Sequence, residues 1–226
     1  MPILMYHHIA EPPRWADAIR RDLSLPPAQF EDHLKYLSEA GYHSIYLEDL
    51  IRHLTLGEPL PEKPIILTFD DGYDDAYKEA YPLLKKYDFV GTFFIITDFV
   101  EKDEYLTWEQ IKLMGEGGME IESHSHTHAD LGGKPLDYIV WQVLRSKELI
   151  EAHTNRTVRF FCYPSGQYDE LVMTILHQTH HWGAVTVNQG VTHSSERPFH
   201  LTRVRIRGSY TAEHLAEKLK WWLAQP

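Results

Sequence analysis

The chain has 226 residues, 43% of them apolar and 24% charged, which is enough to bury one well-packed core. Its formal net charge of -11, with no basic stripe in the sequence, argues against nucleic-acid binding as its main role. No apolar run is long enough for a transmembrane segment, and a single cysteine, Cys162, excludes an intramolecular disulfide framework. We therefore expect one domain over residues 1–226.

Segments typical of strands and helices alternate along the chain. Apolar runs predict strands at residues 2–6, 43–47, 65–69, 90–97, 119–122, 158–162, 182–187 and 201–206. Helical spacing and capping residues predict helices at 27–40, 48–56, 73–87, 107–115, 136–152, 168–180 and 211–223. Residues 9–26 and 188–200 are predicted to be loops because they are polar and rich in turn-forming residues.

This alternation indicates parallel strands joined by crossover helices. No glycine-rich phosphate motif follows a strand, so a dinucleotide-binding fold has no support. We expect an α/β fold, a distorted (β/α) barrel of about seven or eight parallel strands. In such barrels the chemistry gathers at the carboxyl ends of the strands. The residues predicted at those ends are His7, Asp70, Asp71, His124 and the segment 163–166.

Two adjacent carboxylates, Asp70 and Asp71, end the strand at residues 65–69. Successive side chains of a strand point to opposite faces, and an ionised carboxylate is costly to bury without a partner. The pair therefore either forms an ordinary strand-end turn with Gly72, as Asp and Gly often do, or has a partner elsewhere in the chain.

The second notable cluster is a run of alternating histidines, His124, His126 and His128. On a helical turn His124 and His128 share a face, and two histidines with a carboxylate form a standard site for a divalent ion. The alternative is a pair of solvent-facing side chains on a loop. His126 alternates away from the other two, so we do not expect it to be a ligand.

Together these residues could hydrolyse an acyl group. One aspartate would bind the metal, and the other would take the proton of the metal-bound water as general base. The metal and a backbone N–H of the turn at residues 164–166, with Ser165 at its centre, could stabilise the oxyanion. His7, at the end of the first predicted strand, is the best-placed general acid, although it could instead be a structural strand-end residue.

The sequence resembles the polysaccharide deacetylases of carbohydrate esterase family 4, the NodB homology domain. Residues 68–72 (TFDDG) match the first motif of the family, and residues 123–131 (SHSHTHADL) match the second. The resemblance spans nearly the whole chain. It implies metal-dependent removal of acetyl groups, usually N-acetyl, from a GlcNAc-containing polysaccharide. By position Asp70 would be the base, and Asp71, His124 and His128 would bind one divalent ion. Zinc is the expected ion, with nickel, cobalt or iron as alternatives.

Two departures from the family pattern stand out. The third motif often carries an arginine two places before its proline, but Cys162 occupies that position before Pro164, and Arg159 is three residues too early to replace it. The usual late Leu-x-His motif is absent, and Leu-Thr-Arg stands at residues 201–203. Arg203 could reach the barrel mouth and pair with an acid there. Its alternation with Arg205 and Arg207 along a short strand favours a solvated face or internal ion pairs over a nucleic-acid site.

The opening run, residues 3–8 (ILMYHH), resembles the missing late strand moved to the front. A branch of the family that includes deacetylases of poly-β-1,6-N-acetylglucosamine begins in a similar way and is circularly permuted. On this interpretation His7 is the general acid and His8 the second choice.

Aromatic residues could line the substrate site by stacking on sugar rings. Tyr163 and Trp182 are the candidates we select, with Trp182 as the substrate wall; Tyr73 and Trp108 are weaker candidates. The expected partner is an acetylated polysaccharide or oligosaccharide. Alternative functions are an O-acetyl-xylan esterase, another C–N hydrolase of the same fold, or an inactive glycan-binding module.

The resemblance implies a secreted or cell-envelope protein. The first residues, however, contain no basic segment followed by a long apolar stretch, so the sequence predicts no signal peptide. We therefore expect either a cytoplasmic protein or one whose leader or anchor has been removed.

Overall fold

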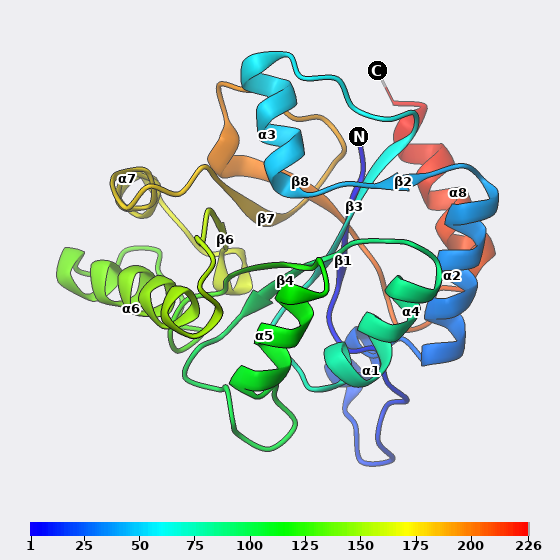
Figure 1. Cartoon of the computed structure of the whole chain (residues 1–226), viewed down its shortest axis with the longest axis horizontal. Coiled ribbons are helices and arrows are strands. Elements are labelled where there is room, and N and C mark those ends of the chain that lie inside the picture. The colour runs from blue at the N-terminus through cyan, green and yellow to red at the C-terminus, as the bar shows by residue number, and fades with distance from the viewer. Residues whose placement is uncertain (226) are drawn as a thin grey trace.

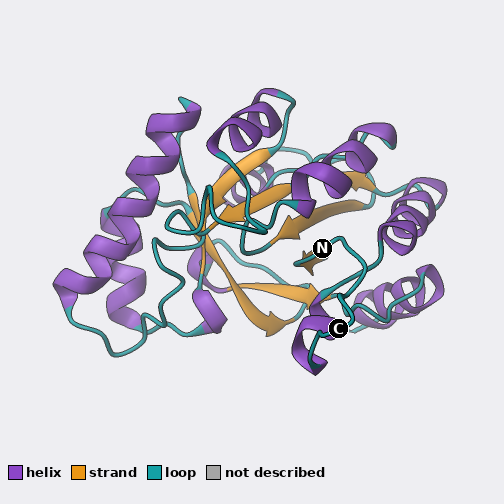
Figure 2. Cartoon of the chain, turned by 90° about the horizontal axis from the view of Figure 1, so that it is seen from below, coloured by secondary structure: helices purple, strands orange, loops and turns teal. Residues whose placement is uncertain are grey.

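A computed structural model describes residues 1–225 as a parallel barrel surrounded by helices (Figures 1 and 2). The strands are β1 (Ile3–Tyr6), β2 (His43–Ser44), β3 (Pro64–Phe69), β4 (Thr92–Ile95), β5 (Glu120–Ser123), β6 (Phe160–Cys162), β7 (Gly183–Gln189) and β8 (Leu201–Arg205). The α-helices are α1 (Ala18–Leu23), α2 (Pro27–Glu39), α3 (Leu47–Leu56), α4 (Tyr81–Lys86), α5 (Trp108–Glu116), α6 (Leu136–Thr154), α7 (Glu170–Gln178) and α8 (Ala212–Leu223).

The barrel closes through the first strand. The strand order is β1-β8-β7-β6-β5-β4-β3-β2, and β1 also pairs with β3, so seven strands form a ring while β2 lies outside it against β3. Every pairing is parallel, and the β7–β8 ladder is irregular between Val185 and Gln189. This arrangement confirms the predicted distorted (β/α) barrel.

The amino end of the barrel is closed by helix α3. Leu47 and Leu50 pack with interior residues of the strands, among them Ile3, Ile66 and Phe160. Figure 1 shows α3 across one end of the barrel, with α1 and its neighbouring loops towards the other. The carboxyl ends of the strands lie at the opposite end of the barrel. Within residues 1–225, no helix is both long enough and apolar enough to cross a membrane.

Two local predictions were wrong. The predicted loop at residues 9–26 contains α1, because the Asp17 side chain accepts a hydrogen bond from Arg20 N and caps a short helix. The predicted continuous helix at 73–87 begins instead with a π-helical turn, Ala76–Ala80, and becomes α-helical at Tyr81. Pro82 has no N–H to donate, so it is accommodated in the first turn of α4.

Candidate active site

The carboxyl ends of β1, β3 and β5 bring the predicted site residues together. Register pairs Tyr6 with Phe69, so the residues that follow them, His7 and Asp70, are neighbours at the same edge. The Asp70 backbone N–H donates to Tyr6 O at 3.0 Å and fixes this register. His124 follows β5, and its N–H donates to Ile95 O of β4 at 2.9 Å.

Asp71, His124 and His128 form one group of possible metal ligands. Asp71 Oδ1 lies 3.2 Å from His124 Nε2 and 3.4 Å from His128 Nε2. Asp71 and His124 are buried, whereas the His128 side chain is 32% exposed and faces the solvent side. Two imidazoles and a carboxylate that converge in this way fit one divalent ion and leave a coordination position open.

The loop that carries the histidines is held by its own hydrogen bonds. Ser125 and His128 both have positive φ, 65° and 57°, and His128 N donates to Ser125 Oγ at 3.0 Å. The buried Gln142 side chain of α6 accepts from the N–H groups of His126 and Thr127. These contacts turn His124 and His128 inward and His126 outward. His126 bonds Thr97 Oγ1 at 2.8 Å and is not part of the ligand group.

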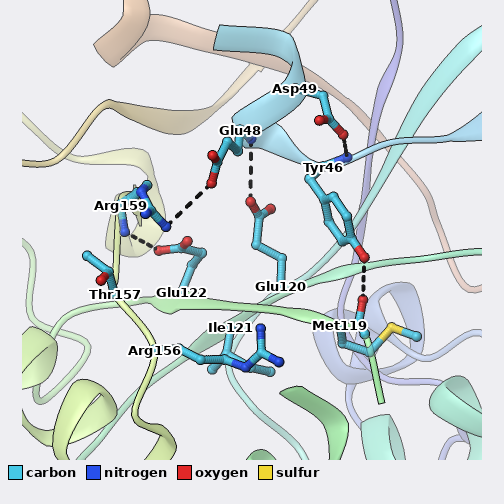
Figure 3. A pocket seen from close by; sticks show the side chains of 11 residues that line it. Tyr46, Glu48, Asp49, Met119, Glu120, Ile121, Glu122, Arg156, Thr157 and Arg159 are labelled. Atoms are coloured by element: carbon cyan, nitrogen blue, oxygen red, sulfur yellow. Dashed lines mark hydrogen bonds and ion pairs between the residues drawn. The ribbon is translucent and has the colours of Figure 1, made fainter. Parts of the chain in front are cut away.

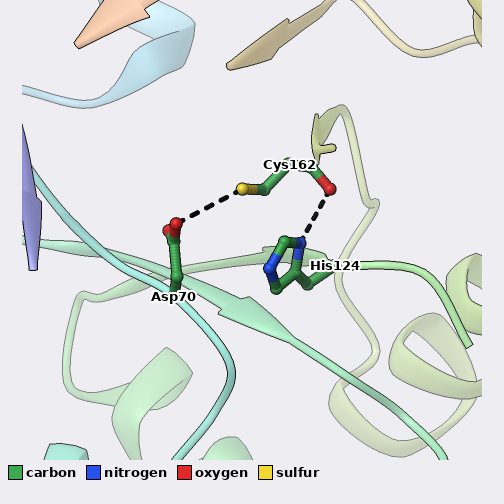
Figure 4. Close-up of side chains that lie close together, drawn as sticks. All are labelled: Asp70, His124 and Cys162. Atoms are coloured by element: carbon green, nitrogen blue, oxygen red, sulfur yellow. Dashed lines mark hydrogen bonds between the residues drawn. The ribbon is translucent and has the colours of Figure 1, made fainter. Parts of the chain in front are cut away.

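The second nitrogen of His124 orients the imidazole. Nδ1 lies 2.8 Å from the carbonyl oxygen of Cys162 and can donate its proton there (Figure 4). This leaves the Nε2 lone pair directed at the Asp71 side, the arrangement that metal-binding histidines adopt when a second hydrogen bond fixes the tautomer.

Figure 4 also shows a second cluster, Asp70, His124 and Cys162, whose ligand atoms are close enough to surround an ion. Cys162 Sγ lies 3.5 Å from Asp70 Oδ2. Arg203 already fills this place with its own positive charge, since its NH2 group contacts both Asp70 Oδ2 and Cys162 Sγ. A metal ion therefore fits the Asp71 group better than this one.

Arg203 of β8 forms a bidentate ion pair with Asp70. NH1 lies 2.7 Å from Oδ1 and NH2 lies 2.7 Å from Oδ2, and both side chains are buried. Arg203 also donates to Thr186 O and to Thr68 Oγ1. Burial alone would raise the pKa of Asp70, but the adjacent guanidinium more than offsets this and holds the pKa below its usual value. Sequence reasoning named Arg203 as able to reach the mouth but could not identify its partner.

Arg159, which is three residues too early in the sequence to replace the missing arginine, lies elsewhere. It precedes β6 at the amino end of the barrel, where it pairs with Glu48 at 3.4 Å.

His7 faces Asp70 and His8 does not. His7 Nε2 is 3.9 Å from Asp70 Oδ2, and His7 Nδ1 is buried without a hydrogen-bond partner among residues 1–225. Burial lowers the pKa of His7, and the negative charges of Asp70 and Asp71 counter this only in part. His8 points to the opposite side, where its Nδ1 bonds Asp75 Oδ2 at 2.7 Å.

Ser165 lies at the carboxyl end of β6, on the same side of the barrel as the ligand group. It is exposed and has a φ of 53°, within the turn Pro164–Gly166. This turn puts its backbone at the edge of the mouth.

Two aromatic predictions were wrong. Tyr163 alternates with the inward-facing Cys162, so its side chain points out of the barrel. There it is buried against residues of α6 and α7, and its hydroxyl donates to Phe199 O. Trp182 immediately precedes β7 and therefore lies at the amino end, where Arg159 is 4.8 Å from its ring. Neither residue can form a substrate wall at the mouth. Trp108, a weaker candidate, stacks on His153.

A pocket of about 430 Å³ lies at the amino end of the barrel, away from the ligand group (Figure 3). Its acids are structural. Glu120 accepts from the N–H groups of Leu47 and Glu48 at the start of α3, and Glu122 accepts from those of Arg159 and Phe160. These bonds attach α3 and β6 to β5.

Comparisons with known proteins point to one family. Residues 57–182 match the family model described as polysaccharide deacetylase. The chain is 33% identical over 206 residues to YxkH of Bacillus subtilis, a protein assigned by name to the polysaccharide deacetylases; the match covers 91% of this chain and 71% of that protein.

A solved structure of the deacetylase PplD from Streptococcus pyogenes, in complex with acetate, superposes with a TM-score of 0.89 at 32% identity. The superposition covers 96% of this chain and 97% of that one. A poly-beta-1,6-N-acetyl-D-glucosamine N-deacetylase of Staphylococcus aureus is 21% identical over 212 residues, which cover 88% of this chain and 72% of that protein.

Proposed function

The chain belongs to the polysaccharide deacetylase family, and we propose that it is a metal-dependent hydrolase that removes N-acetyl groups from a GlcNAc-containing polysaccharide. The observation that carries the proposal is the convergence of Asp71, His124 and His128 next to the Asp70–Arg203 pair. The name of the Staphylococcus aureus relative supports a β-1,6-linked N-acetylglucosamine polymer as the first substrate to test.

The metal ligands in this proposal are Asp71, His124 and His128. A divalent ion held there would polarise the acetyl carbonyl and lower the pKa of a water molecule. Zinc suits two imidazoles and a carboxylate with an open position, and nickel, cobalt or iron are the alternatives. The chain supplies the orientation of these ligands through the Cys162 carbonyl and the hydrogen bonds of the histidine loop.

Asp70 acts as the general base in this mechanism. Its low pKa keeps it ionised, and a carboxylate has about four lone-pair sites, so the two bonds to Arg203 leave positions for the proton of an attacking water. Arg203 weakens the base to some degree, but it also fixes the carboxylate in one orientation. We assign Arg203 as the residue that positions Asp70.

His7 acts as the general acid that protonates the leaving nitrogen. It lies beside Asp70 at the mouth, and its side chain is only 13% exposed, so the proton is delivered from a largely desolvated group. Burial lowers the pKa of His7, and the charges of Asp70 and Asp71 offset this in part in favour of the protonated imidazole that the step needs. The backbone N–H of Ser165 is the proposed donor to the oxyanion.

Acetate release from a set of acetylated substrates tests the proposal. Protein supplied with Zn²⁺ is incubated with poly-β-1,6-N-acetylglucosamine, chitin oligomers, peptidoglycan and acetyl-xylan, with the Asp70→Asn variant as the inactive control. We expect acetate from the N-acetylated glycans. Acetate from acetyl-xylan alone would indicate an O-acetyl esterase instead, and binding without acetate from any substrate would indicate an inactive glycan-binding protein.

A further inference from the structure

The imidazole of His7, the proposed general acid, has no hydrogen bond that fixes its direction. Its Nδ1 is buried without a partner among residues 1–225, and its Nε2 lies 3.9 Å from Asp70 Oδ2, beyond hydrogen-bond distance. A catalytic group that is misplaced by about 1 Å can lose a factor of about 100 in rate, so this ring needs support. That support has to come from the backbone at the end of β1 and from the packing around it.

One buried carboxylate binds both residues that follow His7. Asp75 Oδ1 accepts a hydrogen bond from the backbone N–H of Ile9 at 2.9 Å, and Asp75 Oδ2 lies 2.7 Å from His8 Nδ1. An ionised carboxylate can only accept, so His8 Nδ1 carries the proton of this bond. Asp75 itself is only 8% exposed. Both of its oxygens are therefore used to hold the two residues next to the acid.

Further contacts hold His8. Its N–H donates to Leu23 O at 3.1 Å, and its carbonyl oxygen accepts from Leu25 N at 3.0 Å. Its ring stacks on Tyr73, with ring centroids 3.4 Å apart and planes 23° apart, so this face of Tyr73 is not available to a sugar. Because the peptide group that His7 shares with His8 is held in this way, the direction in which the His7 side chain leaves the backbone is fixed as well.

Asp75 belongs to the same segment as the proposed base. It follows Asp70 and Asp71 and immediately precedes the π-helical turn Ala76–Ala80. Before the acid and the base, the bond from Asp70 N to Tyr6 O joins β3 to β1. After them, Asp75 joins the two segments again. The acid and the base thus lie between two connections, and Asp75 supplies the one that is made by a side chain.

We infer that Asp75 is a positioning residue for His7: by binding the two residues that follow the acid, it holds the imidazole where the leaving nitrogen is protonated. The inference rests on the proposed function, since it takes His7 as the general acid. In that reaction Asp70 takes a proton from the water that adds to the acetyl carbon, the C–N bond breaks, and the nitrogen takes a proton from His7. Loss of Asp75 should therefore slow the step that needs the second proton and leave metal binding unchanged.

The test is a double-mutant cycle on the full chain supplied with Zn²⁺, with acetate release from an N-acetylated glucosamine oligomer as the measured reaction. Asp75→Ala should lower kcat roughly 10–100-fold, with KM and bound metal unchanged. His7→Ala already lacks the acid, so adding Asp75→Ala to it should change kcat by less than about twofold. A merely structural defect would lower kcat by the same factor in both backgrounds.

An aryl ester gives a second measurement, because 4-nitrophenolate is a weakly basic leaving group that departs without a proton. His7→Ala and Asp75→Ala should both hydrolyse 4-nitrophenyl acetate within about threefold of the wild-type rate. Asp74→Ala is the matched control, since this neighbouring carboxylate pairs with Lys78 in a partly exposed contact, and it should match the wild type on both substrates. If circular dichroism shows that Asp75→Ala does not fold, Asp75→Asn, which keeps the size of the side chain, takes its place with the same expectations.

Three results would overturn the role of Asp75 while the proposed function stands: a wild-type kcat for the Asp75 variant, an equal loss in the wild-type and His7→Ala backgrounds, or an equal loss on the amide and the ester. If the wild type does not hydrolyse the ester, the first two decide. If wild-type protein releases no acetate from the N-acetylated oligomer, or His7→Ala releases it at the wild-type rate, the proposed acid is rejected and the role of Asp75 with it.

Discussion

Asp70 and Arg203 are 133 positions apart in the sequence, yet two pairs of their side-chain atoms lie 2.7 Å from each other inside the barrel. Both side chains are buried, so each compensates a charge on the other that would be costly to bury unpaired. The pair joins β3 to β8 across the barrel and puts a fixed carboxylate beside the ligand group.

Removing the guanidinium should destabilise the fold. Arg203→Ala leaves Asp70 buried without its partner, and breaking such a pair costs about 3–5 kcal/mol of unfolding free energy. Urea denaturation measures this loss. Arg205→Ala is the control, because Arg205 pairs with Asp22 in a partly exposed bridge that contributes at most about 1 kcal/mol. Equal losses for the two variants would contradict the importance of the buried pair.

Substitution of Asp70 and substitution of Asp71 should have different effects on metal binding and turnover. Asp70→Asn should retain bound metal but lose turnover, because its carboxylate is outside the preferred ligand group. Asp71→Asn should lose the metal, because Asp71 Oδ1 is the oxygen that faces both histidines. Metal content after dialysis, measured beside acetate release, distinguishes them. Loss of metal from Asp70→Asn alone would reverse the assignment.

His7→Ala should reduce turnover by at least about 100-fold if His7 is the general acid, the lower end for catalysis of this kind. The metal content should stay unchanged, since His7 is not in the ligand group. His126→Ala serves as the control, because His126 lies in the histidine loop but bonds Thr97. A His7→Ala rate equal to that of the wild type would reject the role.

Glu120 should make stability depend on pH. Burial raises its pKa to about 7, despite the hydrogen bonds it accepts from Thr92 and the backbone. The pKa of this side chain in the unfolded chain is expected to be 4.5. Because the folded-state pKa is higher, the contribution of Glu120 to the unfolding free energy is fully present below pH 4.5 and is lost as the pH rises through about 7. The shift corresponds to about 3 kcal/mol.

Glu120→Gln removes this titration. Between pH 5 and pH 8 the wild type should lose stability relative to the variant. The unfolding free energy of Glu120→Gln minus that of the wild type should therefore increase over this range. Urea denaturation at both values measures the difference, and Glu109→Gln, on the exposed side of α5, is the matched substitution. A difference that does not change with pH would contradict the burial of a titrating Glu120.

Local patterns in the sequence were sufficient to predict the barrel and to select most of the residues at its mouth. Asp70, Asp71, His124 and His128 each follow a strand within a few residues, and parallel strands bring such positions to one end. Position in a strand also decided between His7 and His8, since adjacent residues point to opposite sides.

Arg203 could not be paired from the sequence, because its contact with Asp70 depends on the closure of the ring between β1 and β8, which no local pattern encodes. The Cys162 side chain is small and leaves Sγ in contact with both partners of that pair. Trp182 was misassigned although its strand was predicted, because a residue that opens a parallel strand lies at the amino end of the barrel.

Acetate release before and after removal of metal tests the central claim most directly. Wild-type protein is treated with a chelator, dialysed, and incubated with an N-acetylated glucosamine oligomer with or without added Zn²⁺. The account predicts that release stops on chelation and returns with the metal. Full release by protein shown to be metal-free would contradict it.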